Sequence, residues 1–301
     1  MIDIIILGSG PAGLTAAIYG ARANKDVLVL GGDVLGGQMS EIAQLENYPG
    51  FAGSGLTLAE FMKNQAESFG AKFKAESCVK LEWRDSHWHV KSDKSEYEAK
   101  TVVIATGARP RKLDIESARE FVGKGVSYCA TCDGFFYGGK TVAVYGGGNA
   151  ALTDALYLAN IAKKVYIIYR KKSFTRAEAI LVKRAENVPN IERIFSTEIA
   201  QICGSESGVT HIITKSANGE TKIPVDGLFV AIGHEANTDF LSEDHFRDDL
   251  GRLVPAPNSA AIAQGLFVAG DVRSHCKMQI CVATGWGCEA ATDAVAYLNK
   301  N

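Results

Sequence analysis

The sequence contains no hydrophobic stretch long enough to cross a membrane. A transmembrane helix needs about 20 consecutive apolar residues, and no apolar run in the 301 residues approaches that length. Met1 leads directly into the apolar segment Ile2–Leu7 and a glycine-rich loop, which leaves no room for the basic start and cleavage site of a signal peptide. We therefore expect a cytoplasmic protein that has no membrane partner.

The sequence also lacks a strong excess of charge of either sign. Its formal net charge is −2, and no block of like charges or low-complexity segment interrupts it. Binding to nucleic acid usually requires a concentrated excess of Lys and Arg on one surface, so we do not expect a nucleic-acid partner. With 47% hydrophobic and 22% charged residues the composition is that of a globular protein, and the length favours two domains.

The cysteines do not form the regular framework of a disulfide-stapled secreted domain. Such a framework needs an even number of cysteines in a short chain. The seven cysteines of this chain are instead scattered along it: Cys78, Cys129, Cys132, Cys203, Cys276, Cys281 and Cys288. We expect five of them to be small buried side chains. Only Cys129 and Cys132 have CxxC spacing.

What the sequence does contain is one supersecondary pattern that occurs twice. In each copy an apolar strand enters a glycine loop and a helix, and a later apolar strand ends in a second glycine turn. The strands are Ile2–Leu7 and Val102–Thr106 in the first copy, and Val142–Tyr145 and Leu228–Ile232 in the second. Strands that alternate with helices are typical of parallel sheets. We predict an α/β fold of two Rossmann-like, three-layer nucleotide-binding domains.

One further strand has no partner in the second copy. It spans Gly265–Gly270, is followed by Asp271, and precedes a helical segment from about Ala283 to Leu298. We predict that this tail returns to complete the first domain, so that the second domain is an insertion. The expected first domain consists of residues 1–113 and 243–301, and the expected inserted domain of residues 114–242.

Both glycine loops have the spacing of a dinucleotide site. In a GxGxxG loop the first glycine permits a tight turn, the second admits a pyrophosphate, and the third lets the helix pack on the strand. The phosphates then lie at the helix N-terminus, where free N–H groups favour negative charge. The alternative is a pair of tight turns without a ligand. The expected binding residues are Gly8, Gly10, Pro11, Ala12 and Gly13 in the first loop, and Gly146, Gly148, Asn149 and Ala150 in the second.

The segment after the next strand of the second copy is basic. An NAD-binding domain carries an acidic residue about 20 residues past the loop, where it binds the ribose 2′-hydroxyl. Here residues 169–176 contain no carboxylate but include Arg170, Lys171 and Arg176. These side chains are suited to a 2′-phosphate, which favours NADPH over NADH. A solvated basic loop is the alternative.

The Cys129–Cys132 pair lies just before the second nucleotide-binding strand. CxxC marks either a redox disulfide or half of a metal site. A structural zinc site needs four ligands, and neither a second CxxC nor an HxxxH spacing is present, so we expect no metal. Hydride chemistry at two nucleotide sites favours the redox disulfide. Asp133, the next residue, is placed either to carry a proton or to cap the following turn.

Together these motifs resemble the bacterial-type, low-molecular-weight thioredoxin reductases over essentially the whole chain. The matching segments are GSGPAG (8–13), GGQ (36–38), ENYPG (46–50), ATG (105–107), CATCDG (129–134), GGGNAA (146–151) and GD (270–271). The resemblance implies that the first and last segments bind FAD and the inserted domain binds NADPH. Beyond the first loop, it assigns these residues to FAD: Gly37, Gln38, Asn47, Ala105, Thr106, Gly107, Gly270, Asp271 and Gln279.

The resemblance also implies a mechanism. Cys132 is expected to lie against the flavin and to form the charge-transfer thiolate. Cys129 is expected to attack the disulfide of thioredoxin, and Asp133 to donate or accept a proton. A homodimer is implied, together with a rotation of the inserted domain that offers the flavin to NADPH and the dithiol to thioredoxin in turn.

Three departures from the family pattern keep other functions open. The His-Arg-Arg motif of the family reads Tyr169-Arg170-Lys171 here, with one extra residue before Arg176, and Met278 precedes Gln279 where the family usually has Arg. The turn of the second copy that usually ends in Pro-Asn reads His234-Glu235-Ala236-Asn237-Thr238. One alternative is therefore a ferredoxin-fed thioredoxin reductase, or a donor to a peroxiredoxin-like or glutaredoxin-like partner. Another is an FAD-dependent dithiol oxidase that passes electrons to oxygen. A flavoprotein sensor without enzymatic activity would leave the cysteine pair without a use.

Overall fold

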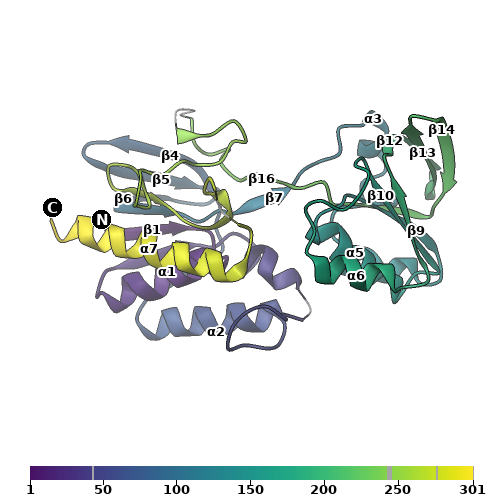
Figure 1. Ribbon diagram of the computed structural model, residues 1–301. Helices are drawn as coiled ribbons and strands as arrows, with labels where there is room; N and C mark the ends of the chain where they lie inside the picture. The colour runs from purple at the N-terminus through teal and green to yellow at the C-terminus, as the bar shows by residue number, and fades with distance from the viewer. Residues whose placement is uncertain (43, 243–245, 276, 301) are drawn as a thin grey trace. The chain divides into compact units, whose positions relative to one another are not determined.

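The computed structural model describes residues 1–42, 44–242, 246–275 and 277–300 (Figure 1). The chain divides into two compact units, one made of Met1–Arg109 and Glu235–Asn301 and the other of Pro110–His234. The first unit is thus assembled from both ends of the chain, and in the sequence the second unit is inserted between these two segments.

The unit boundaries fall earlier than the expected positions 114 and 243. The change occurs after Arg109 and again after His234, while Glu243 lies outside the described residues. The two connecting segments pair with each other as strands β7 (Ala108–Pro110) and β16 (His234–Ala236). Sequence patterns do not reveal such short strands, which explains the displacement.

The first unit is built on a sheet of eight strands with a parallel centre. Strand β1 pairs in parallel with β2 and β6, and β6 in turn pairs in parallel with β18 and antiparallel with β5. The strands are β1 (Ile2–Leu7), β2 (Val27–Leu30), β3 (Lys72–Lys74), β4 (Cys78–Arg84), β5 (His87–Ser92), β6 (Glu96–Ile104), β17 (Ala261–Ala263) and β18 (Leu266–Val268).

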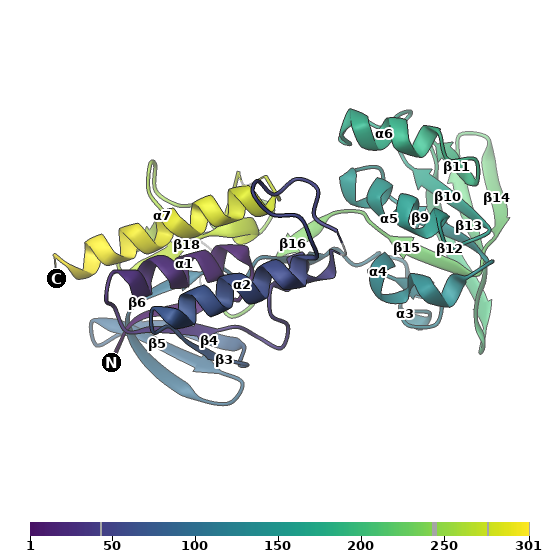
Figure 2. The same cartoon turned by 90° about the horizontal axis from the view of Figure 1, so that it is seen from below.

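Alternating side chains of β1 serve two hydrophobic cores, one on each face of the sheet. Ile4 and Ile6 pack under the helices, while Ile5 and Leu7 pack on the opposite side, where β4 and β5 lie. This alternation follows from the two-residue repeat of a strand. Figure 2 shows the three covering helices side by side: α1 (Pro11–Arg22), α2 (Gly55–Ser68) and α7 (Ile280–Leu298). No helix in the described ranges is long and apolar enough to span a membrane.

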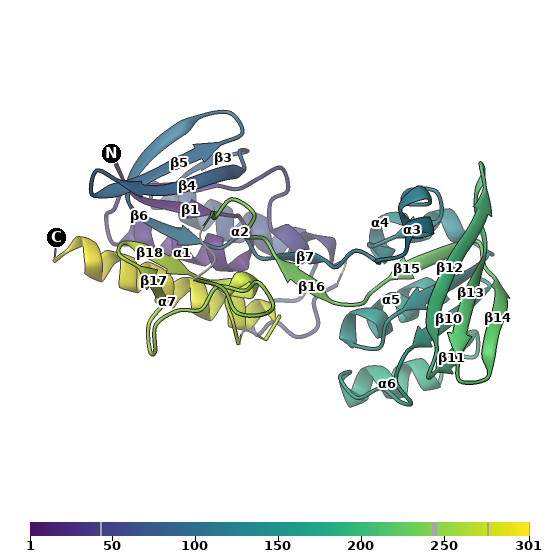
Figure 3. The same ribbon diagram turned by 90° about the horizontal axis from the view of Figure 1, so that it is seen from above.

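The second unit contains a fully parallel five-stranded sheet and a separate antiparallel one. The parallel strands are β8 (Val126–Ser127), β9 (Thr141–Tyr145), β10 (Lys164–Tyr169), β11 (Ile191–Phe195) and β15 (Gly227–Val230). Figure 3 shows helices α5 (Asn149–Ala159) and α6 (Ala179–Glu186) on one face and strands β12 (Glu198–Ser205), β13 (Gly208–Ser216) and β14 (Gly219–Pro224) on the other. The short helices α3 (Glu116–Glu120) and α4 (Ala130–Asp133) precede β9.

The two units repeat one strand order. The order β3-β2-β1-β6-β18 of the first unit corresponds to β11-β10-β9-β15-β8 of the second. The structure therefore confirms a mixed α/β fold with parallel, Rossmann-like sheets. It also supplies the missing counterpart of the strand near residues 265–270, because β8 occupies the equivalent position. With two residues, β8 is too short to produce a hydrophobic pattern.

The packing of α7 on α1 yields a test with a built-in control. A Cβ at Gly287 would lie 2.1 Å from the carbonyl oxygen of Ala12. We expect Gly287→Ala to lower the free energy of unfolding by about 1–3 kcal/mol, because α7 must move outward. Gly285→Ala, on the same helix, meets nothing within 4 Å and should gain up to about 1 kcal/mol from helix propensity. Equal effects in urea unfolding would contradict this packing.

Candidate active site

Cys129 and Cys132 form a disulfide at the start of α4. Their Cα atoms are 5.3 Å apart. The described cysteines outside this pair, Cys78, Cys203, Cys281 and Cys288, carry free thiols but are half-buried, which corrects the expectation of full burial. Each lies on a strand or helix, and Cys78 packs against the edge of a hydrophobic core. Cys276 lies outside the described residues. Burial nevertheless raises the pKa of Cys78 to about 12, so this thiol is unreactive at neutral pH.

The backbone around the disulfide favours negative charge on one of its sulfurs. The N–H of Cys132 donates to Cys129 Sγ at 3.2 Å, and Thr131 Oγ1 lies 3.4 Å from the same sulfur. Ser127 Oγ accepts a hydrogen bond from the N–H of Cys129 at 3.1 Å and fixes the start of the turn. Hydrogen-bond donors aimed at a thiolate stabilise it. In the disulfide, these donors are directed at Cys129 Sγ.

Asp133 is the last residue of α4, and its backbone N–H donates to the carbonyl oxygen of Cys129 at 3.2 Å. The side chain makes no capping hydrogen bond to the turn Gly134–Tyr137, all of which is described, so the capping role is not supported. Burial, together with the charges of Asp133 and Asp226, raises the pKa of Tyr137. Asp133 is half-buried and directly follows Cys132 in the chain.

The redox turn rests on helix α5. A Cβ at Gly134 would lie 2.9 Å from the ring of Tyr157 and 3.1 Å from Leu158 Cδ2, so only glycine allows this close contact. Helix α5 is also the helix that begins at the second glycine loop. One rigid element therefore positions both the disulfide and the loop.

The first glycine loop has the three roles expected of a dinucleotide site. Gly8 has φ +108°, and a Cβ there would lie 2.4 Å from the carbonyl oxygen of Ala105. A Cβ at Gly13 would lie 2.0 Å from the carbonyl oxygen of Gly8, so helix and strand pack closely. At Gly10 the nearest atom is 3.9 Å away, which leaves open space at the N-terminus of α1. Pro11 begins this helix.

The second glycine loop repeats this geometry. Gly146 has φ +153°, and a Cβ there would lie 2.1 Å from the carbonyl oxygen of Ala231, while a Cβ at Gly148 would meet nothing within 4 Å. The third position is occupied by Ala151, which is fully buried. Asn149 and Ala150 form the first turn of α5.

The other residues assigned to the first unit gather around its glycine loop. A Cβ at Gly37 would lie 3.7 Å from Gly10 Cα, and one at Gly270 would lie 2.9 Å from Ala12 Cβ. Asp271 follows in the short helix Gly270–Val272. The remaining contacts are from Gln38 Nε2 to the carbonyl oxygen of Ala108 (2.6 Å) and from Asn47 Nδ2 to Gln279 Oε1 (3.1 Å).

A residue absent from the predicted set, Asn237, locks the ATG turn. Thr106 Oγ1 donates to the carbonyl oxygen of Asn237 at 2.7 Å, and Asn237 Nδ2 donates to the carbonyl oxygen of Thr106 at 2.9 Å. The N–H of Asn237 also donates to the carbonyl oxygen of Gly107 at 3.0 Å. The signal in the sequence is faint: an asparagine four residues after the glycine turn at Gly233.

The basic segment follows β10 and is tied to the second glycine loop. Arg170 and Arg176 are exposed, and Lys171 Nζ lies 3.4 Å from Thr175 Oγ1. Asn149 joins the far end of the segment to the loop: its Nδ2 donates to Glu178 Oε1, and its Oδ1 accepts from the N–H of Glu178, both at 2.7 Å. Glu178 is a second residue absent from the predicted set, because it lies beyond residues 169–176, where an NAD-binding domain would carry its acidic residue.

A disulfide in a CxxC turn, beside a helix that starts at a dinucleotide loop, defines a disulfide oxidoreductase. The model of the family "Pyridine nucleotide-disulphide oxidoreductase" matches residues 2–287. The chain is 42% identical to the thioredoxin reductase of Buchnera aphidicola subsp. Baizongia pistaciae, over 99% of this chain and 94% of the relative. It is 39% identical to that of Escherichia coli O157:H7, over 98% and 96%. The crystal structure of Lactococcus lactis thioredoxin reductase covers 100% of both chains with a TM-score of 0.97 and 32% identity.

The chain therefore belongs to the pyridine nucleotide-disulphide oxidoreductases, among the bacterial-type thioredoxin reductases. It is an enzyme, and its family implies the use of a flavin and a pyridine nucleotide.

In the second glycine loop, one position has room for a side chain and another has none, and the two predict different effects. We expect Gly148→Ala to fold normally, because its Cβ has room and φ is −101°, yet to raise the KM for the pyridine nucleotide at least tenfold by obstructing the pyrophosphate. Flavin content and melting temperature should not change. Gly146→Ala, the control, should fold poorly. Unaltered nucleotide affinity in Gly148→Ala would show that the phosphates lie elsewhere.

Proposed function

We propose that this chain reduces oxidised thioredoxin with electrons from NADPH, carried through FAD and the Cys129–Cys132 disulfide. The observation that carries the proposal is the CxxC disulfide seated, through Gly134, on the helix of a dinucleotide loop. A disulfide with a purely structural role does not need to lie beside a dinucleotide loop. A disulfide that relays electrons from a nucleotide cofactor does.

The residues of the first unit fit FAD. The open space at Gly10 and the free N–H groups at the start of α1 suit a pyrophosphate, and Gly37, Gly270 and Asp271 adjoin the same loop. Bound there, FAD supplies a group that accepts a hydride and passes two electrons to a disulfide. Ala105, Thr106 and Gly107 would form the wall of this site, held in place by Asn237.

The residues of the second unit fit NADPH. Gly148 leaves room for the pyrophosphate, and Arg170, Lys171 and Arg176 supply cations for a 2′-phosphate. Glu178 would repel that phosphate, but its carboxylate accepts a hydrogen bond from the Asn149 amide. The local charge therefore favours NADPH over NADH.

The protein's own chemistry is thiol–disulfide exchange. In the reduced enzyme the thiolate of Cys129, supported by the Cys132 N–H, attacks a sulfur of the thioredoxin disulfide and releases the other sulfur as a thiolate. Cys132 then attacks the mixed disulfide at Cys129 and re-forms the internal disulfide, so that thioredoxin leaves with two thiols. Asp133 holds or returns the proton of the departing thiolate. Two electrons pass from the enzyme dithiol to the substrate.

We propose that the active form is a homodimer. The family resemblance implies one, and the first unit exposes several large apolar side chains, among them Ile42, Leu56 and Phe61.

The donor assignment is tested by anaerobic titration, with NADPH and NADH in turn, while flavin bleaching is followed. NADPH should bleach the flavin at low concentration. In Arg170→Ala/Arg176→Ala the KM for NADPH should rise roughly 10–100-fold, because charge-assisted hydrogen bonds to the phosphate are lost, and the KM for NADH should not change.

Lys172→Ala removes an exposed charge from the same segment and serves as the control. If neither nicotinamide bleaches the flavin, NADPH is not the donor, and ferredoxin-fed reduction or dithiol oxidation takes its place.

The role of the cysteine pair is tested by substitution. We expect Cys132→Ser to retain flavin reduction by NADPH and to lose thioredoxin reduction, because no internal disulfide can form. Thioredoxin reduction is measured in an insulin-coupled assay. Cys203→Ser, which removes a free thiol from β12 of the same unit, should keep full turnover in that assay. Full thioredoxin turnover by Cys132→Ser would refute the mechanism.

A further inference from the structure

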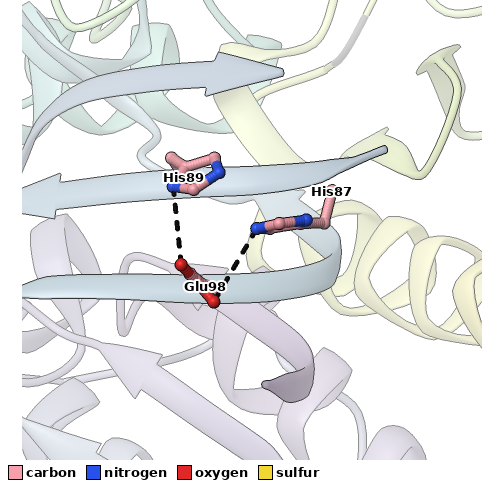
Figure 4. Close-up of side chains that lie close together, drawn as sticks. All are labelled: His87, His89 and Glu98. Atoms are coloured by element: carbon pink, nitrogen blue, oxygen red, sulfur yellow. Dashed lines mark ion pairs between the residues drawn. The ribbon is translucent and has the colours of Figure 1, made fainter. Parts of the chain in front are cut away.

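Two histidines and a glutamate converge on the neighbouring strands β5 and β6 of the first unit (Figure 4). His87 and His89 are two residues apart on β5, so their side chains lie on one face of the sheet. Glu98 lies directly opposite His89 in the antiparallel register of β5 and β6. One ligand atom from each of the three lies within 4.8 Å of the others, and no second such group occurs among the described residues.

The turn before β5 determines which ring nitrogen of His87 carries the proton, and it leaves Nε2 able to accept. Asp85 and Ser86 both have left-handed backbones, with φ +53° and +64°, and form a two-residue hairpin loop. The carbonyl oxygen of Asp85 lies 2.9 Å from His87 Nδ1. A carbonyl can only accept, so Nδ1 carries the proton and Nε2 presents its lone pair. A backbone carbonyl that fixes the tautomer in this way is a usual second partner of a metal-bound histidine.

The ring nitrogens of the cluster are poorly satisfied. Nε2 of His87 is buried with no hydrogen-bond partner in the described part of the chain, and so is Nε2 of His89. His87 Nε2 faces the Glu98 carboxylate at 3.7 Å, and His89 Nδ1 faces it at 3.9 Å. Both separations are too long for a hydrogen bond. A cation between the three side chains would pair with His87 Nε2, with one nitrogen of His89 and with the Glu98 carboxylate.

The cluster already attracts a cation. Arg84 Nη2 lies 3.1 Å from His89 Nδ1, so the guanidinium donates to the nitrogen that faces Glu98. On the other side of His89, Glu82 is its register partner on β4. The pKa of Glu82 is lowered mainly by its hydrogen bond with Lys80 and, to a lesser extent, by nearby charges that include Arg84 and His89. His89 thus lies between two carboxylates, with an exposed arginine in the position of a counter-ion.

We propose that His87, His89 and Glu98 bind a divalent transition-metal ion, with zinc as the ion that best fits the ligands. Two imidazole nitrogens and one carboxylate oxygen are a zinc ligand set that leaves one position for water. Zinc bonds of about 2.0–2.2 Å require the ligand atoms to approach to roughly 3.3 Å. The Glu98 side chain, 57% exposed, has room to close this gap, and Arg84 leaves His89 as the ion enters.

A bound ion would fasten β5 to β6 near the end of the sheet opposite the glycine loop, because Ala99, next to Glu98, pairs with Ile2 at the start of β1. It would therefore stabilise the first unit without taking part in electron transfer. The sequence pattern of such a site is HxH, because ligands on a strand repeat every two residues. The CxxC and HxxxH spacings considered above belong to turns and helices.

Zinc titration of the flavin-loaded protein by calorimetry tests the proposal. The protein is first treated with a chelator and kept free of thiols, because a reduced Cys129–Cys132 pair would itself bind zinc. We expect one zinc ion per chain and a rise in melting temperature. His87→Asn and His89→Asn should each weaken binding by roughly 10–100-fold, whereas His211→Asn, which removes a histidine from β13 of the second unit, should leave it unchanged.

Arg84→Gln is the variant that distinguishes a built site from adventitious binding. Removal of the competing cation should tighten zinc binding several-fold. If the histidine variants lose their flavin, Arg84→Gln and Glu98→Gln still decide the question, because both change exposed side chains. No heat of binding in the wild type, or the same affinity in all these variants, overturns the proposal.

Discussion

In each unit the chain leaves the central strand of the parallel sheet, β1 or β9, through a glycine that has no room for a side chain. Gly8 and Gly146 approach the carbonyl oxygens of Ala105 and Ala231, each of which directly follows the neighbouring parallel strand. Their N–H groups donate to the other neighbouring strand, at the carbonyl oxygens of Leu30 and Ile168. This double attachment holds the turn at the carboxyl edge of the sheet, where the following helix must begin.

The remaining features of the site depend on that turn. Because the helix begins there, its unpaired N–H groups and the open positions Gly10 and Gly148 face outward together. In the second unit this helix, α5, also contacts the redox turn, where the missing side chain of Gly134 leaves room for Tyr157 and Leu158. A change in the angle of α5 would displace both the nucleotide site and the disulfide. The glycine loop and the disulfide are thus mechanically linked through one element of secondary structure.

Much of this arrangement could be predicted from the sequence, because it depends on local patterns. Apolar strands, glycine spacing and CxxC are contiguous signals, and the structure has the strands, loops and disulfide that they indicated. The contacts that were not predicted join residues far apart in the chain. Asn237 with Thr106 and Asn149 with Glu178 leave no periodic trace, and β8, with two residues, has no hydrophobic pattern at all.

The discontinuity of the first unit has a consequence for how the protein is made. Strand β6 is completed by β18, and α1 is covered by α7, yet β18 and α7 emerge from the ribosome only after the whole second unit. The second unit, residues 110–234, is contiguous and can fold as soon as it has emerged. The N-terminal segment must wait with one edge of β6 unpaired, and an unpaired strand edge is a site where chains associate wrongly. During synthesis there is therefore an interval in which the second unit can already be folded while the edge of β6 in the first unit is still exposed.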